Sequence, residues 1–326
     1  MAIHPLWNNY PTIQKQLNET QKVMTKAVKI RNEEMTSALQ LFFQSGGKLL
    51  RPAYFLLFSS FGSLSSSEKR YKFAASLEIL HAATLIHDDI IDDSPLRRDK
   101  PSIQALYGKD IAVYAGDFLF TVYFQLLAQA ADDFSVIELN ASNMRKILVG
   151  ELDQMDLQYN TDITVKQYLR HIKGKTAQLF QLSCYEGAKF SKCSIYIQHI
   201  SQRIGHNIGM AFQILDDILD YSSSEDSLHK PVLEDVQLGN YTLPLILAMQ
   251  ENRAVFLPLL EKKQALNPDE LRTLVQHIHT YNGIDLAQKI ADRFTNKALA
   301  DIKKLPQTPE RDILTEITKH LLNRQD

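Results

Sequence analysis

The chain has 326 residues, of which 44% are hydrophobic and 23% are charged, so it is able to bury a large core and is not intrinsically disordered. The formal net charge of −2 gives no basic surface for nucleic acid, and two cysteines, Cys184 and Cys193, are too few for a disulfide framework. Segment 1–11 lacks the apolar core of a signal peptide, and no apolar run approaches the roughly 18–20 residues of a membrane span. We therefore expect a cytoplasmic protein without a transmembrane segment.

The middle of the chain reads as a series of long helices. Segment 102–230 contains no proline, and strict apolar/polar alternation of the kind that marks strands is rare. Apolar residues recur at helical spacing in three segments, 111–131, 166–189 and 195–220. No stretch rich in glycine, proline and serine separates these segments. The sequence therefore predicts a single all-α domain over residues 1–326, built as a helical bundle.

Two acidic strings of the same DDxxD design, 88–92 and 216–220, each follow an apolar helical run. Residues four apart share a helix face, so the first and last aspartates of each string project together. Like charges at this spacing weaken a helix by roughly 0.2–0.5 kcal/mol per pair. One such pair is equally consistent with a solvated surface, but two on apolar helices indicate a cation, for which oxygen ligands favour Mg²⁺. The candidate ligands are Asp88, Asp89, Asp92, Asp216, Asp217 and Asp220.

Basic residues near the acidic strings indicate a diphosphate as the anionic ligand of the metal. A glycine-containing loop precedes Lys48 and Arg51 at a helix start, where backbone N–H groups also favour an anion. Polar loops are predicted at 93–101 and 222–239, directly after the two acidic strings, which would place both strings at the same open end of the bundle. Taken singly, a basic pair is more often a solvated surface, a histidine such as His81 is more often a core residue, and Gln213 is equally an ordinary polar residue at a helix edge. The remaining candidates are His81, Arg97, Arg98, Lys175, Thr176, Gln213 and Lys230.

Taken in order, these motifs resemble the trans-isoprenyl diphosphate synthases, also called polyprenyl synthetases. The resemblance covers nearly the whole chain and rests on GGKLLRP (46–52), LHAATLIHDDIIDDSPLRR (80–98), AGDFLFTVYFQLL (115–127), GELDQM (150–155), GKTAQLF (174–180), QILDDILD (213–220) and LHKPVLEDVQLGNYTLPL (228–245). It implies the isoprenoid synthase type of helical bundle with a central active-site cavity, and a homodimer. The implied activity is the Mg²⁺-dependent condensation of isopentenyl diphosphate with an allylic diphosphate, by a prenyltransferase of isoprenoid biosynthesis.

The resemblance also implies a role for each candidate residue. About three Mg²⁺ ions grip the allylic diphosphate, with Asp88, Asp92 and Asp216 as main ligands and Asp89, Asp217 and Asp220 assisting or holding metal-bound water. The residues expected to contact the allylic diphosphate are Arg97, Lys175 and Lys230. Isopentenyl diphosphate is expected to bind Lys48, Arg51, His81 and Arg98, while Thr176 and Gln213 face the developing carbocation with their oxygen dipoles.

Small residues before the first acidic string bear on product length. In the resembling family, an aromatic residue at the positions of Ala83 and Thr84 closes the product tunnel early. Here the tunnel is open at that level, so we expect a long-chain product of about C30–C40, with geranylgeranyl (C20) or farnesyl diphosphate as the alternative. Phe118 and other aromatics of the helix around it, Phe120, Tyr123 and Phe124, are candidates for a deeper floor or for plain core.

The sequence departs from the family pattern at three positions near the anion sites. The usual Gly-Lys-Pro reads His229-Lys230-Pro231, which keeps the lysine. Asp99 stands where glycine is common, and Asn240 stands where a second Gly-Lys is expected. Gly-Asn before Thr-Leu-Pro resembles the larger subunit of two-component hexaprenyl or heptaprenyl synthases, so a small regulatory subunit is a candidate partner. A class I terpene cyclase is disfavoured because both acidic strings are DDxxD and the Lys48/Arg51 pair is present. An inactive helical subunit would be expected to lack one acidic string.

Overall fold

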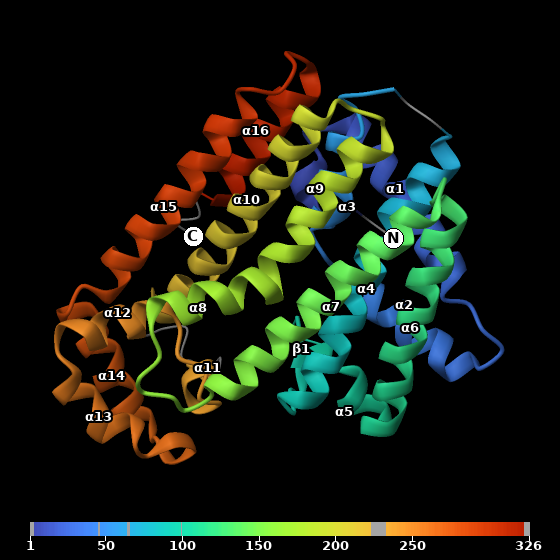
Figure 1. Ribbon diagram of the computed structural model, residues 1–326. Coiled ribbons are helices and arrows are strands. Elements are labelled where there is room, and N and C mark those ends of the chain that lie inside the picture. Colours follow the sequence, from blue (N-terminus) through green and yellow to red (C-terminus); the bar gives the residue numbers. More distant parts are fainter. Residues whose placement is uncertain (1–2, 45, 64–65, 99, 223–232, 323–326) are drawn as a thin grey trace. The chain divides into compact units, whose positions relative to one another are not determined.

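The computed structural model describes residues 3–44, 46–63, 66–98, 100–222 and 233–322, and most of them are helical (Figure 1). Two short strands, β1 (Leu96–Arg97) and β2 (Lys100–Pro101), form an antiparallel hairpin within the predicted polar loop 93–101. The predicted all-α class is confirmed. The helices are η1 (Pro5–Trp7), α1 (Pro11–Ala27), α2 (Glu33–Gln44), α3 (Leu50–Phe58), α4 (Ser67–Ile91), α5 (Ile103–Tyr107), α6 (Lys109–Ala130), α7 (Phe134–Leu157), α8 (Val165–Ile172), η2 (Lys173–Ala177), α9 (Gln178–Phe190), α10 (Ile195–Ser222), α11 (Glu234–Gln237), α12 (Leu243–Glu251), α13 (Arg253–Leu260), η4 (Lys263–Ala265), α14 (Pro268–Thr280), α15 (Gly283–Ile302) and α16 (Pro309–Leu322).

The chain forms two compact units. Unit 1 comprises Met1–Ser142, Leu182–Ser201 and Leu305–Leu314, and unit 2 comprises Asn143–Gln181, Gln202–Lys304 and Thr315–Asp326. Four of the five unit boundaries fall inside helices, namely α7, α9, α10 and α16, and the fifth lies between α15 and α16. The single domain expected from the sequence stays a prediction. The first acidic motif (88–92) belongs to unit 1 and the second acidic motif (216–220) to unit 2.

Helices α4 and α6 pack along each other in unit 1, and both contribute buried side chains to its core. Glycine is required at Gly116 of α6, because a Cβ there would overlap the ring of His87 on α4. The first acidic motif occupies the last turn of α4, and the second lies in the last turns of α10. A carboxylate near a helix C-terminus meets the negative end of the dipole and loses roughly 0.3–1 kcal/mol. Both motifs therefore lie where negative charge is locally unfavourable, which indicates a role other than helix stability.

Helix α6 is the one described helix that is long and apolar enough to cross a membrane by length and composition alone. It has 22 residues, and its most apolar stretch has a mean hydropathy of 1.5. The expectation that no apolar run approaches this length is wrong for this segment, because Asp117 interrupts the run and hides it. Some of its residues, spread along the helix from Ala112 to Ala130, are buried in the core with α4.

The predicted helix 166–189 is interrupted in unit 2 by a π-helical turn. Helix α8 is started by a capping box between Thr164 and Gln167, and it runs into the π turn η2 before α9 continues. A Cβ on Gly174 would lie 2.8 Å from the Cα of Gly150 on α7, so both glycines are needed for this close approach. A π turn widens the helix locally and is often found at functional sites. The π turn at Lys173–Ala177 therefore re-aims the side chains that follow it.

Candidate active site

The first acidic motif exposes its outer carboxylates and buries its second one. Asp92 caps the C-terminus of α4, and its N–H donates to the carbonyl of Asp88 at 2.8 Å, so these two residues lie one helical turn apart on the same side. Both are partly accessible, whereas Asp89 is only 2% exposed. The shared face of Asp88 and Asp92 is confirmed, and Asp89 faces a different environment from its sequence neighbour.

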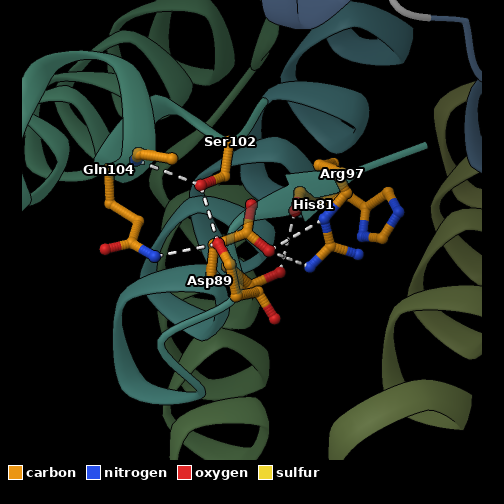
Figure 2. Close-up of polar contacts among 8 residues, drawn as sticks. His81, Asp89, Arg97, Ser102 and Gln104 are labelled. Atoms are coloured by element: carbon orange, nitrogen blue, oxygen red, sulfur yellow. Dashed lines mark hydrogen bonds and ion pairs between the residues drawn. The ribbon is translucent and has the colours of Figure 1, made fainter. Parts of the chain in front are cut away.

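Asp89 is held by Arg97 (Figure 2). The guanidinium Nε of Arg97 donates to Asp89 Oδ1 at 2.9 Å, and its Nη2 donates to the same oxygen. Burial raises the pKa of Asp89, and the hydrogen bonds from Arg97 act in the opposite direction. The intervening turn is fixed because the carbonyl of Ser94 accepts from Ser102 Oγ at 2.7 Å and from Gln104 Nε2 at 2.8 Å. Asp89 thus anchors the Arg97 cation beside the first acidic motif.

A second group of unit 1 residues forms a cavity between the glycine loop and α4. We call it the basic pocket; its polar lining includes Glu78, His81 and Arg98. Gly47 also lines it, and a Cβ there would lie 3.0 Å from Arg98 Nη1, so the missing side chain leaves room for the guanidinium. The backbone of Arg98 is left-handed, with φ of 53°. Two of the four residues expected to bind isopentenyl diphosphate, His81 and Arg98, therefore line one pocket.

The other two expected residues, Lys48 and Arg51, lie close to this pocket, and Arg51 interacts electrostatically with charged residues that line it. Burial lowers the pKa of Arg51 to about 10, with Arg98 adding to the decrease and Glu78 opposing it. Burial also lowers the pKa of His81 well below its ordinary value, and Arg51 and Arg98 contribute, so His81 is neutral at pH 7. The indole N–H of Trp7 donates to the carbonyl of Lys48 at 2.6 Å and fixes the glycine loop. Sequence reasoning missed Glu78, since a glutamate in an apolar helix carries no signal of which charges surround it.

The second acidic motif repeats the pattern of the first in unit 2. Asp216 and Asp220 are exposed on α10, whereas Asp217 is 4% exposed. The buried carboxylate accepts hydrogen bonds from Tyr168 Oη at 2.5 Å and from Gln213 Nε2 at 2.7 Å. Burial raises the pKa of Asp217 well above its ordinary value, and these two hydrogen bonds oppose the shift. In each motif the outer carboxylates are accessible, and the second carboxylate is buried and accepts hydrogen bonds from other residues of the protein.

Thr176 and Gln213, the pair expected to face a carbocation, are joined to this network. Thr176 Oγ1 donates to Gln213 Oε1 at 2.6 Å. Because the hydroxyl proton and the amide group are both used within the protein, the lone pairs of the threonine oxygen stay available. The chain of bonds from Thr176 through Gln213 to Asp217 fixes the orientation of these dipoles before any substrate binds.

Lys175 lies in the π turn and is oriented by α7. Its ammonium group lies 3.0 Å from Glu151 Oε2 and donates to Gln154 Oε1 at 2.9 Å. Both partners belong to the GELDQM string, which the sequence marks only as part of the family resemblance. The π turn and these two acceptors determine where the lysine charge lies, so they are positioning groups for Lys175.

A second cavity, in unit 2, brings together Lys175, Gln213 and Asp217. It is also lined by Asp235 and Asn240, and the N–H of Asn240 donates to the carbonyl of Asp235 at 2.7 Å. Asp235 was missed because it lies in the short helix α11, far along the chain from the DDxxD pattern. The structure thus adds a further carboxylate near the second acidic motif. The predictions that concern Lys230 and Asp99 lie outside the described residues.

The chemistry of the acidic motifs fits a magnesium ion. Among residues that the structure describes, no three His, Cys, Asp or Glu side chains gather into a ready-made metal cage. Each motif offers two accessible carboxylates, and Mg²⁺ is usually held by one or two carboxylates while water and substrate phosphates complete its octahedron. The oxygen donors that are present are therefore of the kind and number that suit a metal bound together with a diphosphate.

Comparison with known proteins shows which family the chain belongs to. A family model described as polyprenyl synthetase matches residues 32–278. The chain belongs to the polyprenyl synthetase family. This polyprenyl synthetase is accordingly a prenyltransferase, as the sequence resemblance implied.

Relatives of this polyprenyl synthetase support the assignment. Heptaprenyl diphosphate synthase component 2 of Bacillus subtilis (strain 168) is 33% identical over 282 residues, 86% of this chain and 80% of that protein. The crystal structure of geranylgeranyl pyrophosphate synthase from Lactobacillus brevis ATCC 367 has a TM-score of 0.95 at 42% identity, covering 98% of this chain and 99% of the other. The polyprenyl synthase of Caulobacter crescentus CB15, complexed with calcium and isoprenyl diphosphate, has a TM-score of 0.90 at 26% identity, covering 98% and 97%. The isoprenoid synthase fold is thereby confirmed.

The residues expected to govern product length lie on the packed pair α4 and α6 of this polyprenyl synthetase. Ala83 is fully buried, and Thr84 is half-buried with its hydroxyl donating to the carbonyl of His81 at 2.8 Å. Phe118 is half-buried on α6, while the hydroxyl of Tyr123 donates to Asn140 Oδ1 at 3.0 Å in the core. Tyr123 is therefore tied into a polar network, and Ala83, like its neighbour Ala82, is a small buried side chain in the turns that precede the first acidic motif.

Proposed function

We propose that this polyprenyl synthetase condenses isopentenyl diphosphate with an allylic diphosphate in a Mg²⁺-dependent reaction that extends a trans-polyprenyl chain. The observation that carries the proposal is the repeated pattern of the acidic motifs, in which the outer carboxylates are accessible and the second is buried and bonded by the protein. Two accessible carboxylates beside a buried one suit a metal ion that also binds a diphosphate. They do not stabilise a helix end, where negative charge is unfavourable.

The chemistry needs charge stabilisation and orientation, not a covalent enzyme intermediate. The allylic C–O bond breaks and its electron pair leaves with pyrophosphate; bound Mg²⁺, about three ions by family resemblance, supplies the neutralising charge. The double bond of isopentenyl diphosphate then forms the new C–C bond to the carbocation, and the proton that is lost goes to pyrophosphate. Asp88, Asp92 and Asp216 are proposed as the main metal ligands, with Asp220 assisting.

The buried aspartates are proposed to act through their partners. Asp89 keeps Arg97 beside the first acidic motif, where the guanidinium would contact the allylic diphosphate. Asp217 orients Gln213, and through it the oxygen of Thr176, toward the developing positive charge. Lys175 and Lys230 are proposed as further contacts of the allylic diphosphate. Isopentenyl diphosphate is proposed to occupy the basic pocket, where Lys48, Arg51, His81 and Arg98 hold it in a fixed orientation for attack.

We favour a long-chain product of about C30–C40, with C20 as the alternative. The heptaprenyl relative supports the longer product, and the 42% identical geranylgeranyl synthase supports the shorter one. The small volumes of Ala83 and Thr84 support the longer product, because nothing bulky at these positions stops a chain that grows past them.

Replacing Ala83 with phenylalanine is expected to shorten the product by at least one C5 unit. Ala83 is fully buried, so an aromatic ring there must take volume from the space that the growing chain would occupy or from the core. Product lengths resolved by chromatography check this, with Ala83→Ser as a small matched control that keeps the wild-type distribution. An unchanged distribution in a folded Ala83→Phe variant refutes the tunnel assignment.

We further propose a cytoplasmic homodimer that is assisted by a small regulatory subunit. The name of the Bacillus relative, component 2, supports a two-component enzyme, as does Asn240 in its Gly-Asn-Tyr-Thr-Leu-Pro context. The proposed location, homodimer and small subunit go beyond the family membership, and the proposed reaction does not depend on them.

Product chemistry tests the reaction against its rivals. The purified chain is supplied with farnesyl diphosphate and labelled isopentenyl diphosphate in the presence of Mg²⁺. We expect the label in a longer, linear diphosphate. A cyclised hydrocarbon made from farnesyl diphosphate alone would instead identify a terpene cyclase, and inertness even with candidate partner subunits would identify a non-catalytic helical subunit.

A further inference from the structure

Glu78 is a buried carboxylate that lines the basic pocket and has no part in the roles assigned so far. It lies on α4, is 8% exposed, and faces the pocket with His81 and Arg98. Its Oε2 atom is buried and has no hydrogen-bond partner in the structure. An incompletely paired buried carboxylate costs stability unless nearby charges compensate it. Its presence in a pocket for an anion therefore needs an explanation.

The compensating charges are two arginines of the same pocket region. Burial raises the pKa of Glu78, and Arg51 and Arg98 oppose this shift because each favours the ionised carboxylate. Glu78 in turn favours the charged form of Arg51 and of Arg98. Arg98 and Arg51 disfavour each other, because their like charges are brought together in a desolvated place. His81 is neutral and adds no charge. Glu78 is thus the one acidic side chain among the described residues lining this pocket.

This arrangement solves a problem that any diphosphate pocket has when it is empty. Arg51 is half-buried and Arg98 is exposed, so without an anion the repulsion between the two guanidinium groups drives them apart and toward solvent, which would disorder the pocket before substrate arrives. A carboxylate behind them keeps both in place without blocking the donors that a diphosphate needs, since each guanidinium has five N–H groups. Gly47 allows Arg98 to reach this position.

We propose that Glu78 is a positioning residue for isopentenyl diphosphate, which holds Arg51 and Arg98 in the binding arrangement while the basic pocket is empty. The inference rests on the proposed function, since it assigns this pocket to isopentenyl diphosphate. Glu78 itself does not touch the reacting atoms, and its effect is confined to one of the two substrates.

Replacing Glu78 with glutamine tests the proposal with little change in shape. We expect KM for isopentenyl diphosphate to rise about tenfold or more, while KM for the allylic diphosphate and kcat at saturation change less than about threefold. Glu78→Asp keeps the charge and should give a smaller increase. Glu186→Gln is the matched control: this glutamate is also buried in unit 1, 1% exposed, but it accepts a hydrogen bond from Asn140 away from the pocket, so neither KM should change.

The possible outcomes separate this inference from the proposed function. If the wild-type chain does not incorporate isopentenyl diphosphate, the proposed function fails. If it does, and Glu78→Gln leaves KM for isopentenyl diphosphate unchanged or raises both KM values equally, the positioning role is overturned. Should Glu78→Gln fail to fold, the double variant Glu78→Gln/Arg98→Gln, which removes the opposite charge too, is expected to fold. An unfolded double variant would show that Glu78 serves core packing and would also overturn the proposal.

Discussion

Replacing Asp88 or Asp216 with alanine is expected to lower kcat by roughly 10²–10³-fold, equal to about 2.7–4 kcal/mol of transition-state stabilisation. Each of these carboxylates is accessible in its motif, and each is expected to hold a cation that neutralises the departing pyrophosphate. The fold should survive, because removing one charge from the negative end of α4 or α10 relieves a local repulsion. Steady-state kinetics with isopentenyl and farnesyl diphosphates provide the measurement.

Asp132→Ala is a suitable control for this pair of variants. Asp132 belongs to an exposed ion pair with Lys69 in unit 1, remote in sequence from both acidic motifs, and surface pairs of this kind contribute about 0–1 kcal/mol. Its kcat should equal that of the wild type. A near wild-type kcat in Asp88→Ala or Asp216→Ala would contradict the assignment of these residues as metal ligands.

Replacing Lys175 with alanine is expected to lower kcat by roughly 10²-fold. The π turn places this lysine, and Glu151 and Gln154 orient its ammonium group at 3.0 and 2.9 Å. We expect Lys175 to weaken its contacts with Glu151 and Gln154 and to bind the diphosphate as negative charge develops on the leaving group. Because the interaction strengthens in the transition state, kcat should decrease more than KM for the allylic substrate increases.

Lys173→Ala is the matched control for Lys175, since it removes an exposed lysine from the same π turn. Its kinetics should stay close to wild type, and thermal unfolding should show both variants folded. A Lys175→Ala enzyme in which only KM increases, with kcat unchanged, would show that the lysine binds the substrate uniformly and would contradict its proposed role in stabilising the leaving group.

The sequence allowed much of the architecture to be predicted because helix signals are local. The absence of proline from 102–230 and the helical spacing of apolar residues predicted α6, the run through α8 and α9, and α10 with ends near those observed. The hairpin of β1 and β2 was not foreseen, because two-residue strands carry no periodicity. The membrane-length apolar run of α6 was overlooked because a single aspartate interrupts it.

The repeated acidic motifs of the candidate site could be predicted from the sequence. The roles of residues that depend on burial could not. In the sequence, Asp88 and Asp89 look alike, as do Asp216 and Asp217; only the structure shows that the second of each pair is buried. Burial depends on the partner elements, Arg97 from the hairpin for one motif and Tyr168 of α8 for the other. Glu78 and Asp235 were missed for the same reason, since their significance comes from neighbours distant in sequence.

The metal dependence of prenyl transfer tests the central claim most directly. The enzyme is stripped with a chelator, and the incorporation of labelled isopentenyl diphosphate into an allylic primer is measured before and after Mg²⁺ is restored. We expect no incorporation without the metal, full recovery with it, and a linear polyprenyl diphosphate longer than the primer. Incorporation that continues at the same rate in the stripped enzyme, or Mg²⁺-restored enzyme that leaves the primer unextended, would contradict this expectation.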